Sequence, residues 1–308
     1  MNIISFFKWV IDFLFKNNLS TTTTTTIPDI ITTTTTAVSH ITTTTTAGGN
    51  KKMKVALCVG INQYPNPANN LDGCVNDAND FASLLKDQYK FDEVKILLNS
   101  DATLQNVSNY ISALLDKKPD VFVMTNSSHG TRIASSTESD GYCEALCLYD
   151  KFLMDHDFHQ MLAKADSKTK ITIVSDSCHS AGVTRAFLMA MNDFSYVSKP
   201  KYLPHPDNLE AFSVSMMPIA KAVFEPNESM NEVLMAGCKS SEFSYDANFD
   251  GRDNGAFSYY AIKLLKSNPS LTYGEFVEKM TQYLPSGRYP QTPVVETNEG
   301  MKNCVIFG

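Results

Sequence analysis

Several features that mark common classes of protein are scarce or missing in this 308-residue chain. Its seven cysteines are odd in number and lack the regular spacing of a disulfide framework, which favours a reducing, cytoplasmic compartment. There is no basic patch, and the net charge is −7, so a nucleic-acid partner is not expected. The first residues carry no early positive charge and no small-residue cleavage site, so a secretory signal peptide is not expected. What remains is a chain whose 43% hydrophobic content is ample for a packed core.

The first fifty residues differ in composition from the rest. Residues 1–16 are mostly apolar, and their five polar residues fall on one narrow stripe of a helix. Such a helix is too short and too charged to span a bilayer, and it either lies on a membrane surface or docks on the rest of the chain as a pro-segment. A threonine-rich, low-complexity stretch follows. We therefore expect an amphipathic segment over residues 1–18, a linker over 19–52 and a globular domain over 53–308.

From residue 53 onward, strand-like runs alternate with helical patterns. Apolar, β-branched runs predict strands at 55–60, 93–98, 121–126, 170–175 and 232–237. Helical periodicity predicts helices at 77–89, 103–116, 155–165, 256–266 and 273–283, the last with a capping box of Thr272 and Glu275. The alternation predicts an α/β fold with a mostly parallel sheet covered on both faces. The segment from about 183 to 231 breaks the rhythm and is predicted to be a long inserted loop.

Two of the predicted strands end in residues suited to nucleophilic chemistry. Cys178 follows one of them, and His129 follows another, 49 residues earlier. Because adjacent parallel strands open onto one crevice at their carboxyl ends, we expect the two side chains to meet there. The histidine would convert the thiol into the attacking thiolate. The backbone N–H groups of Gly130 and Cys178 are the candidate donors to an oxyanion, so the implied reaction is acyl transfer, which requires no cofactor.

The cysteines also raise the alternative of a zinc site. Cys143 and Cys147 lie four residues apart, and a histidine would complete the ligand set. The paired Cys-x-x-Cys spacing is absent, so the sequence does not favour zinc. Residues 246–251 imitate half of an EF-hand loop, but Phe257 stands where position twelve requires glutamate, and we predict a polar turn instead.

Short motifs along the chain resemble those of one family, the metacaspases, which are cysteine peptidases of the caspase fold. They include Ser-Ser-His-Gly at 127–130, Asp-Ser-Cys-His-Ser at 176–180 and Met-Ala-Gly-Cys-Lys-Ser-Ser-Glu at 235–242. The separation of histidine and cysteine agrees with the spacing of about 50 residues known for caspases. The resemblance runs from Val55 to about Thr297. It implies a caspase-like three-layer sandwich and a cysteine endopeptidase that acts on protein or peptide substrates as a monomer.

The resemblance also implies cleavage after arginine or lysine. Asp77 matches one of the family's acidic pocket residues, and Cys74 and Ser127 match positions that line the same pocket. Asp176 lies two residues before Cys178, on the same face of the strand, and should place a second carboxylate beside the substrate. Two carboxylates pair well with a guanidinium or ammonium group that is costly to bury alone.

Metal activation and self-processing are two further expectations. Many metacaspases need calcium as an activator, and the matching carboxylates here are Asp150, Asp155 and Asp157, with His156 in place of another. The inserted loop offers basic residues to an enzyme that prefers them. We therefore hypothesise self-cleavage after one or more of Arg185, Lys199, Lys201 and Lys221.

Three residues near the proposed dyad depart from the family pattern: Asn126, Ser128 and Ala181. A Cβ at Ser128 would crowd the histidine loop. These departures favour an alternative, in which the chain is a weakly active or inactive caspase-fold interaction protein held at a membrane by residues 1–16. The intact dyad and acidic pair favour the peptidase, since a scaffold has no physical need for that set.

Overall fold

The computed structural model describes residues 51–135, 142–178, 198–204, 232–239 and 242–308. The chain divides into two units, residues 1–49 and 50–308. The predicted amphipathic segment and all but the last two residues of the predicted linker lie outside the described residues, as do Arg185, Ala181 and Lys221. In the part of the chain that the structure describes, no helix is long and apolar enough to cross a membrane.

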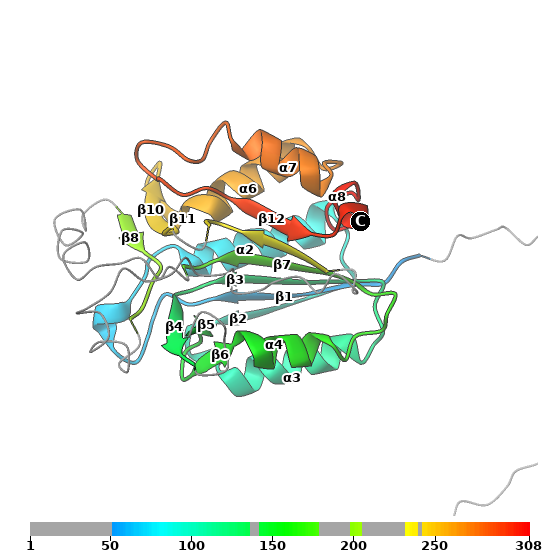
Figure 1. The fold of residues 1–308 in the computed structure, drawn as a ribbon, viewed down its shortest axis with the longest axis horizontal. Coiled ribbons are helices and arrows are strands. Elements are labelled where there is room, and N and C mark those ends of the chain that lie inside the picture. The colour runs from blue at the N-terminus through cyan, green and yellow to red at the C-terminus, as the bar shows by residue number, and fades with distance from the viewer. Residues whose placement is uncertain (1–50, 136–141, 179–197, 205–231, 240–241) are drawn as a thin grey trace, which may run out of the picture. The chain divides into compact units, whose positions relative to one another are not determined.

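A six-stranded sheet lies at the centre of the second unit, in the order β12-β9-β7-β3-β1-β2 (Figure 1). All neighbouring strands are parallel except β12, which runs antiparallel to β9. The bounds are β1 Lys54–Gly60, β2 Glu93–Leu98, β3 Val121–Ser127, β7 Lys170–Asp176, β9 Glu232–Ala236 and β12 Val294–Thr297. The predicted mostly parallel sheet is confirmed. Its inner strands are mostly apolar because both of their faces are buried.

Helices cover both faces of the sheet, which gives three layers (Figure 1). One core cluster joins alternate strand residues such as Ala56 and Cys58 to helices α2, α6 and α7. The other joins Leu57 and Val59 to α3 and α4. The bounds are α2 Cys74–Ser83, continued by a π-helical turn over Leu84–Gln88, α3 Leu104–Leu115, α4 Asp155–Leu162, α6 Ala256–Ser267, α7 Tyr273–Met280 and the short α8 Glu299–Lys302. The predicted capping box of Thr272 and Glu275 is present at the start of α7.

Two small antiparallel sheets lie at the end of the main sheet where its parallel strands terminate (Figure 1). The first is a meander of β4 Gly130–Ala134, β5 Tyr142–Cys147 and β6 Phe152–Met154. The second orders β11 Arg252–Gly255, β10 Tyr245–Phe249 and β8 Ser198–Pro200. The β10–β11 turn contains Asp250 and Gly251 at φ 53° and 86°, so the predicted polar turn is confirmed.

Part of the predicted inserted loop is ordered strand, which corrects the expectation of a loop from about 183 to 231. Strand β8 pairs with β10 through Lys199 and Asp246, and Tyr202 forms a bridge with Gly130. Its three residues are half-buried and include a proline, so no hydrophobic alternation predicts the strand. The consequence is that this segment enters the crevice at the carboxyl ends of β3 and β7.

Candidate active site

Strands β3 and β7 bring His129 and Cys178 to one edge of the sheet. Their parallel register pairs Ser127 with Asp176, and each of the two proposed catalytic residues follows two positions later. His129 is 5% exposed and Cys178 is fully buried. The predicted crevice is therefore built from the ends of neighbouring parallel strands.

The His129 side chain is held in one orientation. Its Nε2–H donates to the carbonyl oxygen of Asn69 at 2.8 Å, and its backbone N–H donates to the Tyr64 hydroxyl at 3.1 Å. Because a carbonyl only accepts, Nδ1 is the unprotonated nitrogen. Nδ1 is buried and has no hydrogen-bond partner among the described residues. An unpaired acceptor of this kind is what a general base for a thiol requires.

Burial lowers the pKa of His129 to about 4, with a further contribution from the Lys201 charge. We expect an NMR titration of His129 in the Cys178→Ala chain to give a midpoint near pH 4. Since the unfolded state then binds the proton more readily, the free energy of unfolding should fall by up to about 3 kcal/mol as the pH falls from 6.5 to 4. The His129→Gln variant should lack this component, and a midpoint near 6.5 would contradict the buried, neutral imidazole.

The Cys178 thiol contacts the backbone of Ser244 and the side chain of Cys238. The Ser244 N–H donates to Sγ at 2.8 Å, and Sγ–H donates to the Ser244 carbonyl at 3.1 Å. The backbone N–H groups of Gly130 and Cys178, predicted as oxyanion donors, converge on one oxygen, the carbonyl of Lys201, at 3.0 and 3.1 Å. These distances match those of donors that stabilise a tetrahedral intermediate.

The Lys201 side chain fills the predicted acidic pocket. Its Nζ lies 3.2 Å from Asp77 Oδ2, 3.2 Å from Asp176 Oδ2 and 2.8 Å from Ser127 Oγ, and the side chain is fully buried. Burial alone would lower the pKa of Lys201, but the neighbouring Asp176, Cys74 and Asp77 raise it well above its usual value. Lys201 is therefore a buried ammonium group paired with two carboxylates.

Both carboxylates are fixed by further hydrogen bonds. Asp77 accepts from Ser127 Oγ at 2.7 Å, from Asn254 Nδ2 at 2.8 Å and from the Gly255 N–H at 2.9 Å. Asp176 accepts from the backbone and hydroxyl of Ser258 and from the Ser244 hydroxyl. Burial raises the pKa of Asp77 to about 6, against the opposing effect of Lys201, so this carboxyl is ionised at neutral pH. Of the predicted pocket residues, Cys74 is buried at the start of α2, and burial raises the pKa of its thiol.

The caspase domain family matches residues 53–304, which span the whole of this site and most of the chain. The chain belongs to that family. A metacaspase-1 of Scheffersomyces stipitis is 27% identical over 78% of this chain and 69% of its own length, and a metacaspase-3 of Trypanosoma brucei brucei is 28% identical over 80% and 71%. A metacaspase-6 of Arabidopsis thaliana is 37% identical over 42% of this chain and 39% of its own. The chain is thus a metacaspase-like cysteine endopeptidase with the caspase fold.

A solved structure agrees with this fold. A Geobacter sulfurreducens protein superposes with a TM-score of 0.59 at 23% identity. The superposition covers 82% of the present chain and 97% of the Geobacter chain. At this level of identity the likeness extends to the fold alone.

Several residues of this caspase domain that shape the site have no signal in the sequence. Ser244 contacts Cys178 through its backbone, and Tyr64 supports His129 through its hydroxyl. A Cβ at Gly255 would lie 2.0 Å from Asp176 Oδ2 and 2.2 Å from Lys201 Nζ, so only glycine leaves room for a basic side chain.

Two of the departures from the family pattern, Asn126 and Ser128, are accommodated, which corrects the expectation that Ser128 crowds the histidine loop; Ala181 lies outside the described residues. Asn126 Nδ2 donates to Ser128 Oγ at 2.9 Å and to Ser177 Oγ at 2.8 Å, and Ser128 Oγ donates to the His129 carbonyl at 3.0 Å. These polar side chains therefore tie the histidine loop to the cysteine loop.

The three predicted calcium ligands of the caspase domain lie in different settings. Asp150 Oδ1 accepts from the backbone of Leu104 at the start of α3, 2.9 Å away. Among the described residues, the group whose donor atoms converge is Cys143, Asp155 and His156, with all three atoms within 4.8 Å of one another. Of the three predicted calcium ligands, Asp155 is the one that belongs to this group.

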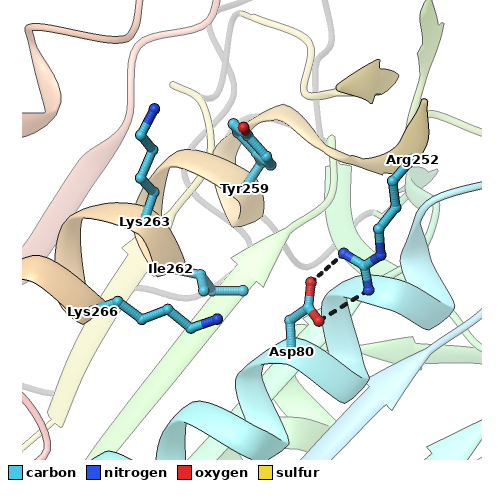
Figure 2. Close-up of a pocket in the computed structure, with 6 residues that line it drawn as sticks. All are labelled: Asp80, Arg252, Tyr259, Ile262, Lys263 and Lys266. Atoms are coloured by element: carbon cyan, nitrogen blue, oxygen red, sulfur yellow. Dashed lines mark hydrogen bonds and ion pairs between the residues drawn. The ribbon is translucent and has the colours of Figure 1, made fainter. Parts of the chain in front are cut away.

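A separate hollow of about 420 Å³ lies on the α2 and α6 side of the domain (Figure 2). In it, Arg252 pairs with Asp80 through both guanidinium nitrogens, and Tyr259, Lys263 and Lys266 of α6 complete part of the wall. It shares no residue with the dyad or the acidic pocket. The catalytic crevice is a different place, filled by Lys201.

Proposed function

We propose that this chain hydrolyses peptide bonds after lysine or arginine, with Cys178 as nucleophile and His129 as general base. One observation carries the proposal. Lys201 lies as the residue before a cleaved bond should lie, with its ammonium group between two carboxylates and its carbonyl oxygen between two oxyanion donors. Its N–H also donates to a crevice backbone carbonyl, that of Ser244, at 2.9 Å.

The steps of the proposed reaction follow from these positions. The Cys178 proton passes to Nδ1 of His129, and Sγ attacks the carbonyl carbon of the substrate. The N–H groups of Gly130 and Cys178 stabilise the oxygen as it becomes negative. The imidazolium then gives its proton to the departing amine, which leaves a thioester on Cys178. Water, deprotonated by His129, hydrolyses the thioester and restores the thiol.

The pocket also supports a choice of substrate. A lysine or arginine side chain would replace the Lys201 ammonium between Asp77 and Asp176. A substrate aspartate in this pocket would place a third carboxylate beside those of Asp77 and Asp176, which is strongly unfavourable in a buried site.

Paired peptide substrates test this proposal. Short peptides with arginine, lysine or aspartate before a fluorescent leaving group would be incubated with the full chain. We expect hydrolysis of the arginine and lysine peptides and none of the aspartate peptide. Hydrolysis of the aspartate peptide at a similar rate would contradict the assignment of the pocket.

We infer that, among the four candidates for self-cleavage, the cut falls after Lys201. Lys199 lies only two residues away, but its Nζ is 2.6 Å from Asp72 and its side chain is 40% exposed. Lys201 is the described candidate whose carbonyl meets the oxyanion donors. While it stays there, the segment also blocks entry of other substrates.

Substitution of Lys201 should therefore have two effects. Lys201→Gln should prevent the cut between residues 201 and 202, and should lower the apparent KM of the uncut chain for an arginine peptide by about tenfold, because the pocket is no longer occupied. Lys201→Arg should still be cut. Lys199→Gln is the matched control and should resemble the wild type in both. Intact mass and initial rates measure these effects, and continued cutting after position 201 in Lys201→Gln would contradict the inference.

A further inference from the structure

A cluster of three donor atoms lies outside the catalytic crevice. Cys143 belongs to β5, and Asp155 and His156 form the first turn of α4. Cys143 Sγ lies 2.8 Å from Asp155 Oδ1 and 3.6 Å from His156 Nδ1, and the two latter atoms are 3.7 Å apart. The proposed reaction uses none of these side chains.

The chemistry of the donors identifies the class of ligand. A thiolate, an imidazole and one carboxylate form a set that zinc and similar transition-metal ions prefer. Calcium instead takes six to eight oxygen ligands, and this cluster offers a single carboxylate. We propose that Cys143, Asp155 and His156 bind a transition-metal ion of the Zn²⁺ class.

The spacing of the donors fits a tetrahedral ion closely. Zinc bond lengths of about 2.0–2.3 Å separate tetrahedral ligands by about 3.3–3.7 Å. Two of the three separations, 3.6 and 3.7 Å, agree with this range. The third, 2.8 Å, is the hydrogen bond from the Cys143 thiol to Asp155, and it lengthens when the metal replaces the thiol proton. That proton leaves to solvent as the Zn–S bond forms.

A second carboxylate supports the histidine. His156 Nε2 lies 3.2 Å from Asp157 Oδ1, on the opposite side of the ring from Nδ1. A carboxylate in this position holds the Nε2 proton, so that Nδ1 presents its lone pair to the metal. Cys143 is 2% exposed, whereas the His156 side chain is 54% exposed. The site therefore has a buried anchor and an open side, where water supplies the fourth ligand.

The site joins two parts of the fold that the reaction depends on. Strand β5 pairs with β4, with Cys143 opposite Ile133 and Leu146 opposite Gly130. Gly130 is the oxyanion donor, so a metal that links β5 to α4 stabilises the hairpin that carries it. This last step rests on the proposed function, but metal binding itself does not.

The test uses the full-length Cys178→Ala chain, in which the dyad thiol neither binds metal nor cuts the chain. Calorimetric titration with zinc chloride should show one site, and saturation should raise Tm by about 5 °C. Cobalt(II) in its place should give thiolate-to-cobalt charge-transfer absorption. Adding Cys143→Ala should abolish that absorption and weaken zinc binding at least about 100-fold.

Two further variants guard against misfolding and misassignment. His156→Asn changes an exposed side chain, so it should keep the metal-free Tm and still weaken zinc binding at least about tenfold. Cys304→Ala removes a half-buried cysteine outside the cluster and should bind zinc as its parent does. Zinc binding that is unchanged by both Cys143→Ala and His156→Asn would overturn the proposal. So would binding of calcium chloride at this cluster without binding of zinc.

Discussion

Replacing Cys178 by alanine is expected to lower kcat for an arginine peptide by about 10⁶-fold. The reason is that, in the proposed reaction, the Sγ atom forms the covalent bond to the substrate. His129→Ala should have an effect of similar size, because the two residues act as a unit and their losses do not add. Steady-state kinetics on the purified chains measure both.

The control for this substitution is a cysteine that plays no part in the crevice. Cys304 is half-buried near the end of the chain, and Cys304→Ala should keep the wild-type rate. If the Cys178→Ala chain retained hydrolysis within tenfold of the wild type, the nucleophile would be misassigned. If the wild type itself showed no hydrolysis of any peptide, the alternative of an inactive caspase-fold interaction protein would be favoured.

Replacing Asp77 by asparagine is expected to lower kcat/KM for an arginine peptide by about 30- to 1,000-fold. Truncating one partner of a buried, hydrogen-bonded charge pair costs about 2–4 kcal/mol, because the arginine is left with one carboxylate in a site that excludes water. A peptide with glutamine in the same position lacks the charge, so its low kcat/KM should change little. The decisive measurement is therefore the ratio of kcat/KM for the arginine peptide to kcat/KM for the glutamine peptide.

A neighbour on the same helix provides the matched control. Asp80 lies one turn further along α2 and pairs with Arg252 in the separate hollow (Figure 2). Asp80→Asn should leave the preference for arginine unchanged. An equal loss in Asp77→Asn and Asp80→Asn would indicate a general effect on stability rather than a role of Asp77 in the pocket.

The sequence predicts the parts of this molecule that depend on side-chain chemistry. The inner strands are predicted because burial on both faces favours apolar runs, as in Val121–Met124 at the start of β3. The dyad and Asp176 are predicted because thiol, imidazole and carboxylate groups occur at strand ends, whereas Asp77 lies in helix α2 and is predicted from the family resemblance alone. Strands β8, β10 and β11 are short and largely polar, so periodicity does not reveal them.

The rest of the site depends on backbone carbonyl and N–H groups, which occur at nearly every residue. The carbonyl of Asn69 and the backbone of Ser244 have no signature in composition or spacing. Composition offers four basic residues to the crevice but does not tell which of them reaches it. Of the two described candidates, Lys199 and Lys201, the residue directly after β8, Lys201, reaches the acidic pocket.

The sequence also does not reveal which side chains lie beside Cys143, the cysteine considered for a zinc site. Cys143 and Cys147 are close in sequence, but four residues of strand separate them by about 13 Å, too far to share one ion. The structure instead places Cys143 beside His156, which follows it after a further strand and a turn.

The most direct test is the intact mass of the full wild-type chain, purified and then incubated at neutral pH beside the Cys178→Ala chain. The structure predicts a wild-type cut between Lys201 and Tyr202, which gives a new N-terminus at Tyr202, and an intact Cys178→Ala chain. A wild-type chain that hydrolyses arginine peptides yet is cut only elsewhere, or stays whole, would contradict the assignment of Lys201 as a bound substrate residue.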